Sequence, residues 1–155
     1  TEEFVTEMMD KHPELKQENT LSVHIRRGDC FMNPDIHPIA TEKYIENALK
    51  EIGEYSHVFV FSDDKNWVKE NLKFENVTYV EDEDYREMWL MSLCKNNIIV
   101  NSTFSWWGSF LNKNPNKKIV APSIWFGPRG PRNYKDIYES YWTVIEVKYE
   151  DGWLN

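Results

Sequence analysis

Cysteine, glycine and proline are scarce in this sequence, and it contains no long hydrophobic run. Its 155 residues include 2 Cys, 6 Gly and 7 Pro, too few for a disulfide framework, a four-cysteine zinc site, a collagen-like repeat or a low-complexity linker. The longest apolar runs, at 58–61 and 98–100, have the length of strands, whereas a helix that crosses a bilayer needs about 20 apolar residues. We therefore expect no transmembrane segment, and the first residues show no secretory signal pattern.

Positive charge is also in short supply. The sequence has 18 Lys and Arg against 26 Asp and Glu, which gives a net charge of −8. Because an acidic surface repels nucleic acids and anionic lipids, we expect no nucleic-acid partner, and any phosphate site has to be a local positive cluster. The hydrophobic fraction of 41% suffices for a self-standing core. We interpret residues 1–155 as one domain with an irregular, aromatic tail from about residue 125.

Helical and extended patterns alternate along the chain. Apolar spacing predicts helices at 2–11, 41–52 (with Thr41 as N-cap), 84–95 and within 102–111. A further helix, capped by Ser62 or Asp63, is expected to carry Trp67, Val68 and Leu72. Short apolar runs predict strands at 21–25, 58–61, 77–80, 97–100 and 119–121, with a last extended piece at 142–147. This alternation is typical of an α/β fold, a parallel sheet with helices on both faces.

Three polar clusters follow predicted strands: 24–29, 62–64 and 101–108. In open α/β sheets, ligands bind beyond the carboxyl ends of the strands. The sequence has no glycine-rich phosphate loop, so an arginine and a hydroxyl-rich helix start would have to bind phosphate instead. It also has no Cys/His cluster, and we expect no metal site.

Each cluster also has a plain structural explanation. An Arg-Arg pair is usually a solvated face, and Ser62-Asp63-Asp64 by itself is usually a helix cap. The Trp106-Trp107 pair suits a core, and His24 suits a buried histidine in a strand. Their equivalent positions at three strand ends favour the functional interpretation.

The same segments resemble glycosyltransferase family 11, the α-1,2-fucosyltransferases. The resemblance rests on His-x-Arg-Arg-x-Asp at 24–29, on Phe-Val-Phe-Ser-Asp-Asp at 59–64 with Trp67-Val68, and on Asn-Ser-Thr-Phe-Ser-Trp-Trp-Gly at 101–108. Segments 85–95, 114–122 and 125–126 are also similar to that family. The resemblance covers roughly residues 20–126 and, more weakly, 136–147.

The resemblance implies a GT-B-like enzyme of two Rossmann-like domains. Such an enzyme transfers fucose from GDP-fucose to a galactoside hydroxyl, inverts the anomeric carbon, and needs no metal or other cofactor. The motifs belong to its C-terminal, donor-binding half, so the chain is expected to be that half, inactive without an N-terminal acceptor domain of similar size. In a bacterium, the expected location is cytoplasmic or peripheral to the inner membrane.

The resemblance also implies roles for the residues at the end of the first strand. Arg26 would bind the β-phosphate of the departing GDP, and Arg27 would fix the geometry of the motif. His24 would contact the nucleoside. Since His24 and Arg26 lie on one side of an extended strand, we expect both to face the ligand, with Arg27 turned toward the protein and Asp29.

The remaining implied roles fall on the other clusters. Asp63 or Asp64 would accept hydrogen bonds from guanine N1–H and N2–H₂. A second phosphate cradle would consist of Ser102, Thr103 and Ser105. Asp29 and Asp35 are the two candidates for the general base, and Asp35 also suits a turn cap.

Two other interpretations stay open. The domain could be a non-catalytic nucleotide-sugar or glycan-binding module whose aromatic tail stacks on sugar; the rings concerned are Trp125, Phe126, Tyr134, Tyr138, Tyr141 and Trp142. It could also be an interaction domain in which an Arg26–Asp29 contact only holds a loop.

Overall fold

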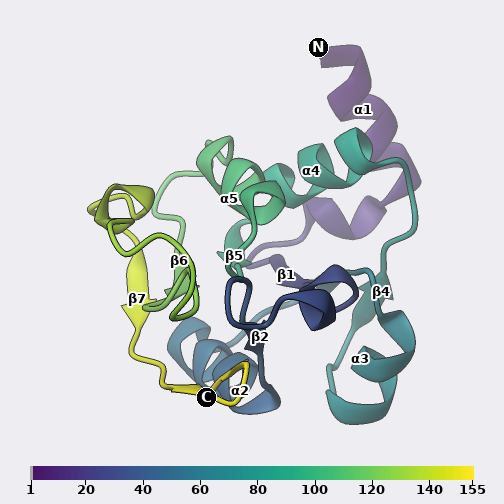
Figure 1. The fold of residues 1–155 in the computed structure, drawn as a ribbon. Helices are drawn as coiled ribbons and strands as arrows, with labels where there is room; N and C mark the ends of the chain where they lie inside the picture. The colour runs from purple at the N-terminus through teal and green to yellow at the C-terminus, as the bar shows by residue number, and fades with distance from the viewer. Residues whose placement is uncertain (1) are drawn as a thin grey trace.

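The computed structural model describes residues 2–155 as alternating strands and helices (Figure 1). The helices are α1 (Glu2–Lys11), α2 (Glu42–Ile52), α3 (Lys65–Asn71), α4 (Asp84–Leu93) and α5 (Thr103–Phe110), with short 3-10 helices η1 (Pro13–Lys16), η2 (Asp29–Met32) and η3 (Lys135–Ile137). The strands are β1 (Leu21–Ile25), β2 (Ile39–Ala40), β3 (Val58–Ser62), β4 (Val77–Tyr79), β5 (Asn96–Ile98), β6 (Ile119–Pro122), β7 (Thr143–Ile145), β8 (Tyr149–Glu150) and β9 (Trp153–Leu154).

Six of these strands form one parallel sheet in the order β4-β3-β1-β5-β6-β7. The predicted α/β class is confirmed, and the sheet is Rossmann-like. Because the strands are parallel, all their carboxyl ends meet at one edge of the sheet. The strand order places β4 at one end of that edge and β6 and β7 at the other (Figure 1).

Strand β3 shows why its sequence is apolar without interruption. Val58 and Val60 pack into the core cluster that includes residues of α2 and α3, whereas Phe59 and Phe61 pack into the cluster that includes residues of α1 and α4. In Figure 1, α1, α4 and α5 cover one face of the sheet, and α2 and α3 cover the other. A strand between two helical layers is buried on both faces, so it needs no polar alternation.

A small second sheet, which the sequence interpretation did not include, joins the middle of the chain to its end. It has the order β2-β9-β8, with β8 and β9 antiparallel. The two residues between β8 and β9, Asp151 and Gly152, have φ angles of 48° and 90°, as a tight hairpin turn requires. In the sequence, the Asp-Gly pair was the feature that could have indicated this hairpin.

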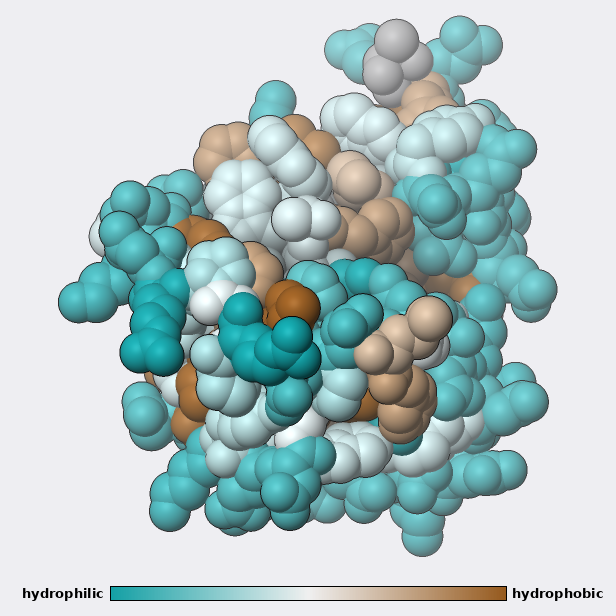
Figure 2. Space-filling view, in the orientation of Figure 1, coloured by the Kyte–Doolittle hydropathy of each residue, from teal (hydrophilic) through white to brown (hydrophobic). Residues whose placement is uncertain are grey.

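The surface is mainly hydrophilic, with paler and brown residues gathered over α4 and α5 in the view of Figure 2. The exposed aromatic side chains there are Tyr85, Trp89, Trp107 and Phe110. Trp107 is therefore outside the core, although its neighbour Trp106 packs against the buried cluster around Trp125 and Trp142. Among residues 2–155, the helices are all too short or too polar to cross a bilayer.

Candidate functional site

A cavity of about 570 Å³ opens at the carboxyl edge of the sheet, beyond β1, β3, β4 and β5. Its walls are His24, Arg26, Asp29, Ser62, Asp63, Lys65, Glu81, Asp82, Asp84, Glu87, Ser102, Thr103 and Phe104. We call this cavity the edge cleft. All three polar clusters singled out in the sequence contribute to it, because their strands are neighbours in the sheet.

His24 in β1 and Arg26 just after it both line the edge cleft, as their spacing in the sequence predicted. His24 is only 7% exposed, and burial together with the nearby Arg26 charge lowers its pKa to about 3. Its imidazole is therefore neutral at physiological pH. The buried Nδ1 has no hydrogen-bond partner among residues 2–155.

Arg26 is held by Asp29 at the start of η2. Its Nε donates to Asp29 Oδ1 at 2.8 Å, and its second guanidinium nitrogen donates to Asp29 Oδ2. This forked pair raises the pKa of Arg26 and lowers that of Asp29. The expectation that Arg27 turns toward Asp29 is wrong, because η2 brings the Asp29 carboxylate back to the side of Arg26.

Arg27 points away from the edge cleft into the protein and is 4% exposed. Its Cζ lies 3.6 Å from the Trp67 ring centroid and 5.2 Å from that of Trp153. Its Nε lies 3.5 Å from Asp64 Oδ2. The side chain therefore joins the loop after β1 to α3 and to the end of the chain.

The carboxylates of Asp63 and Asp64 bind this chain's own backbone. Asp63 accepts the N–H groups of Arg27 at 2.8 Å and Gly28 at 2.9 Å. Asp64 accepts the Trp67 N–H at 3.1 Å and is the N-cap of α3, so the prediction that Ser62 or Asp63 would cap that helix is wrong. Asp63 lines the edge cleft, whereas Asp64 does not.

The start of α5 supplies hydroxyl groups. Ser102, its N-cap, makes no side-chain capping bond, and both Ser102 and Thr103 line the edge cleft. Ser105 lies inside the protein, where its Oγ donates to the backbone oxygens of Val100 and Ser102 at 3.4 and 3.3 Å. The structure thus brings two of the three predicted hydroxyls to the cleft wall.

The segment after β4 and the first turn of α4 add acidic residues that the sequence interpretation did not single out. They are Glu81, Asp82, Asp84 and Glu87. The sequence feature that could have indicated them was the acidic run directly after the predicted strand at 77–80. Lys65 was missed as well, although it directly follows the 62–64 cluster.

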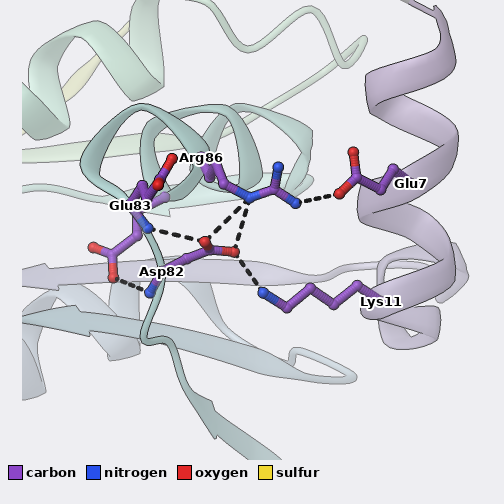
Figure 3. A network of polar contacts seen from close by, with 6 residues as sticks. Glu7, Lys11, Asp82, Glu83 and Arg86 are labelled. Carbon is purple, nitrogen blue, oxygen red and sulfur yellow. Dashed lines mark hydrogen bonds and ion pairs between the residues drawn. The ribbon is translucent and has the colours of Figure 1, made fainter.

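Asp82 is neutralised within the protein. It accepts hydrogen bonds from Lys11 at 2.6 Å and from Arg86 at 3.1 Å, and Arg86 also donates to Glu7 (Figure 3). These bonds tie α1 to α4. With Lys11 as the largest cause, they lower the pKa of Asp82 to about 2.

Glu87 differs from its acidic neighbours because it is half-buried and has little charge compensation. Its Oε1 accepts the Asp82 N–H at 3.1 Å, and Oε2 has no partner within the described residues. Burial raises its pKa. Within residues 2–155, no three His, Cys, Asp or Glu side chains are grouped so that they could hold a metal ion.

Comparison with known protein families matches residues 3–146 to the family described as Glycosyl transferase family 11. Two curated proteins of Escherichia coli are similar. The O-antigen biosynthesis glycosyltransferase WbnK is 41% identical over 119 residues, which is 70% of this chain and 39% of that protein. An alpha-1,2-colitosyltransferase is 37% identical over 143 residues, 83% of this chain and 48% of that protein. The chain thus spans less than half the length of both relatives.

Among solved structures, the fucosyltransferase NodZ from Bradyrhizobium matches with a TM-score of 0.49 and 16% identity, over 72% of this chain and 42% of that chain. A structure of NodZ alpha-1,6-fucosyltransferase soaked with GDP-fucose matches with a TM-score of 0.48 over the same shares.

Proposed function

The chain belongs to glycosyltransferase family 11, as its motifs predicted, and from this premise we propose that the edge cleft binds GDP-fucose as donor. The reaction would be the transfer of fucose to a galactoside hydroxyl in α-1,2 linkage, with inversion and without a metal ion. This chain would be the donor-binding half of a GT-B-like enzyme. A second domain would then hold the acceptor glycan.

The order of charges along the edge cleft carries this proposal. At the β1 and β5 end lie the Arg26 guanidinium, paired with Asp29, and the hydroxyls of Ser102 and Thr103. At the β4 end lie the carboxylates of Glu81, Asp82, Asp84 and Glu87, and Asp63 and Lys65 lie between the two ends. A guanidinium and a helix start suit a diphosphate. Carboxylates suit a nucleobase that presents N–H donors. A guanine nucleotide diphosphate lying along the edge would meet both.

We assign guanine recognition to Glu87 in place of Asp63 and Asp64. Both aspartates already use their oxygens on backbone N–H groups or on Arg27. Glu87 lines the edge cleft and keeps one carboxylate oxygen for a ligand. A carboxylate there can accept from guanine N1–H and N2–H₂, whereas adenine offers no such pair of donors.

Arg26 would stabilise the leaving group. Breaking the bond between the sugar C1 and the phosphate oxygen places negative charge on the β-phosphate, and a fixed guanidinium stabilises this charge more in the transition state than in the ground state. Asp29 would hold Arg26 in place. Because its carboxylate is already bound by that guanidinium and its pKa is lowered, Asp29 is a weak base. Asp35, the other candidate, does not line the edge cleft and accepts the Tyr149 hydroxyl, so we assign the general base to neither.

A second candidate donor carries colitose. It is favoured by the 37% identity with the alpha-1,2-colitosyltransferase over 83% of this chain. Both donors would use the same nucleotide contacts, so they differ only at the sugar. Competition of GDP-fucose and GDP-colitose for this chain would distinguish them.

Calorimetry of this chain with GDP, ADP and UDP tests the proposal. We expect GDP to bind most tightly, and Glu87→Gln to weaken GDP on the order of tenfold while leaving ADP unchanged, because one charged hydrogen bond is lost. Glu83→Gln is the matched control, since Glu83 precedes α4 but does not line the edge cleft. Absence of GDP binding would overturn the proposal, and equal affinities for the three nucleotides would overturn the role of Glu87.

A further inference from the structure

A second cavity, of about 440 Å³, opens beside the segment that follows β6. Its walls are Ile124, Phe126, Gly127, Pro128, Pro131, Arg132, Tyr134 and Tyr149. We call it the aromatic pocket. It shares no wall residue with the edge cleft.

The structure divides the aromatic tail into core and pocket. Trp125 and Trp142 are 3% and 6% exposed and belong to a buried cluster, and Tyr138 donates to the Pro122 carbonyl at 2.7 Å. These rings support the fold. Phe126 and Tyr134 are only half-buried and line the aromatic pocket, with ring centroids 5.9 Å apart and planes at 67°.

The pocket wall combines apolar rings with one cationic group. Arg132 is exposed and makes no ion pair with any residue in 2–155, and the wall contains no carboxylate. Small-molecule sites of this volume typically have apolar and aromatic walls with a few polar groups that orient the ligand. A pyranose fits this chemistry, because its C–H face packs on an aromatic ring and its hydroxyls accept hydrogen bonds from a guanidinium.

The loop between β1 and β2 connects the aromatic pocket to the edge cleft. Its first part supplies Arg26 and Asp29 to the cleft. Its later part holds the pocket: Asp35 Oδ1 accepts from the Tyr149 hydroxyl at 2.6 Å, and the Asp35 carbonyl accepts the Arg129 N–H at 3.0 Å. A Cβ on Gly127 would lie 2.3 Å from the Asp35 carbonyl oxygen, so only glycine permits this close approach.

We infer that the aromatic pocket binds one pyranose of the acceptor glycan, alongside the part of the glycan that the second domain would hold. The inference rests on the proposed function, since a transferase must hold its acceptor near the carboxyl edge where the donor lies. Phe126 and Tyr134 pack on the sugar ring, and Arg132 donates to its hydroxyls. The hydrogen bond between Asp35 and Tyr149 holds this wall against the loop that carries Arg26.

Nuclear magnetic resonance titration of the ¹⁵N-labelled chain with methyl β-galactoside tests this site. We expect shift changes at 124–134 and at Tyr149. Tyr134→Ala and Arg132→Ala should weaken binding on the order of fivefold to tenfold, the usual effect of removing an aromatic or arginine anchor. Tyr141→Ala and Arg129→Ala are the matched controls, because both residues are exposed and outside the pocket wall.

The inference is overturned if the galactoside shifts no residue of 124–134, or if Tyr141→Ala weakens binding as much as Tyr134→Ala. GDP is then added to the same samples, and shift changes at Arg26 and Glu87 report its binding to the edge cleft separately. If GDP binds but the galactoside does not, this inference alone is overturned. If the galactoside binds but GDP does not, the donor assignment alone is overturned.

Discussion

The guanidinium of Arg27 lies over the Trp67 ring, with its Cζ 3.6 Å from the ring centroid. This contact joins the loop after β1 to α3. Its neighbour Arg26 instead faces the edge cleft and pairs with Asp29. Two adjacent arginines thus have opposite surroundings, and they should respond differently to the same conservative substitution.

Arg27→Lys should destabilise the fold. Lysine keeps the charge but loses the planar group that stacks on Trp67, a loss of about 1–2 kcal/mol at a desolvated site. For a domain of this size, the melting temperature should fall by about 2–8 °C. Thermal melting checks this, with Arg129→Lys at an exposed position as the control. An unchanged melting temperature would show that the stack contributes nothing.

Arg26→Lys should leave the melting temperature nearly unchanged but weaken GDP binding. A lysine cannot donate the fork of hydrogen bonds that a phosphate accepts from arginine. We expect a loss of about 1.5–3 kcal/mol in binding free energy, the scale of a charged hydrogen bond. Calorimetry measures it, and normal GDP binding by this variant would move the leaving-group role to another residue.

Acid should destabilise the protein partly through Asp82. Its pKa falls from 3.8 to about 2 in the folded state, so its ion pairs stabilise the fold above pH 4, and this contribution is lost as the pH falls toward 2. The loss is about 2 kcal/mol by proton linkage. Urea unfolding at pH 5, 3 and 2 measures it.

The variant Asp82→Asn should be less stable than the wild type at pH 5 and should lose less stability on acidification. Asp136→Asn, at an exposed position in η3, should keep the wild-type dependence on pH. If Asp82→Asn shows the full wild-type slope, the network of Figure 3 does not carry the acid sensitivity.

Chelation should not affect nucleotide binding. The Asp63 and Asp64 carboxylates are bound to backbone N–H groups of this chain, which leaves them poorly placed to share a divalent cation with a phosphate. We expect the same GDP affinity by calorimetry in EDTA and in Mg²⁺. A tenfold loss in EDTA would show that the donor is bound through a metal.

Much of the fold could be predicted from local patterns. The apolar run at 58–61 indicated a strand buried on both faces, and β3 is that strand. The spacing at 41–52 indicated α2, with Thr41 as its N-cap. The hairpin of β8 and β9 was missed, because each strand has only two residues and shows no periodicity.

The edge cleft was predictable in place but only partly in detail. Polar residues after parallel strands share one edge, so His24, Asp63 and Ser102 could be grouped from sequence alone. Ser105 was included because it stands in the same motif. One turn into α5, however, its hydroxyl binds the backbone oxygens of Val100 and Ser102 inside the protein.

By itself, the sequence determined the α/β class, the family and the sheet edge where the cleft opens, because hydrophobic periodicity and chain order are local properties. Only the tertiary structure decided which side chains remain available to a ligand. Asp63 is occupied by the N–H groups of Arg27 and Gly28 on another strand's loop, while Glu87 reaches the cleft because β4 lies beside β3. These partners are far apart in the chain, and the pairing of parallel strands alone brings them together.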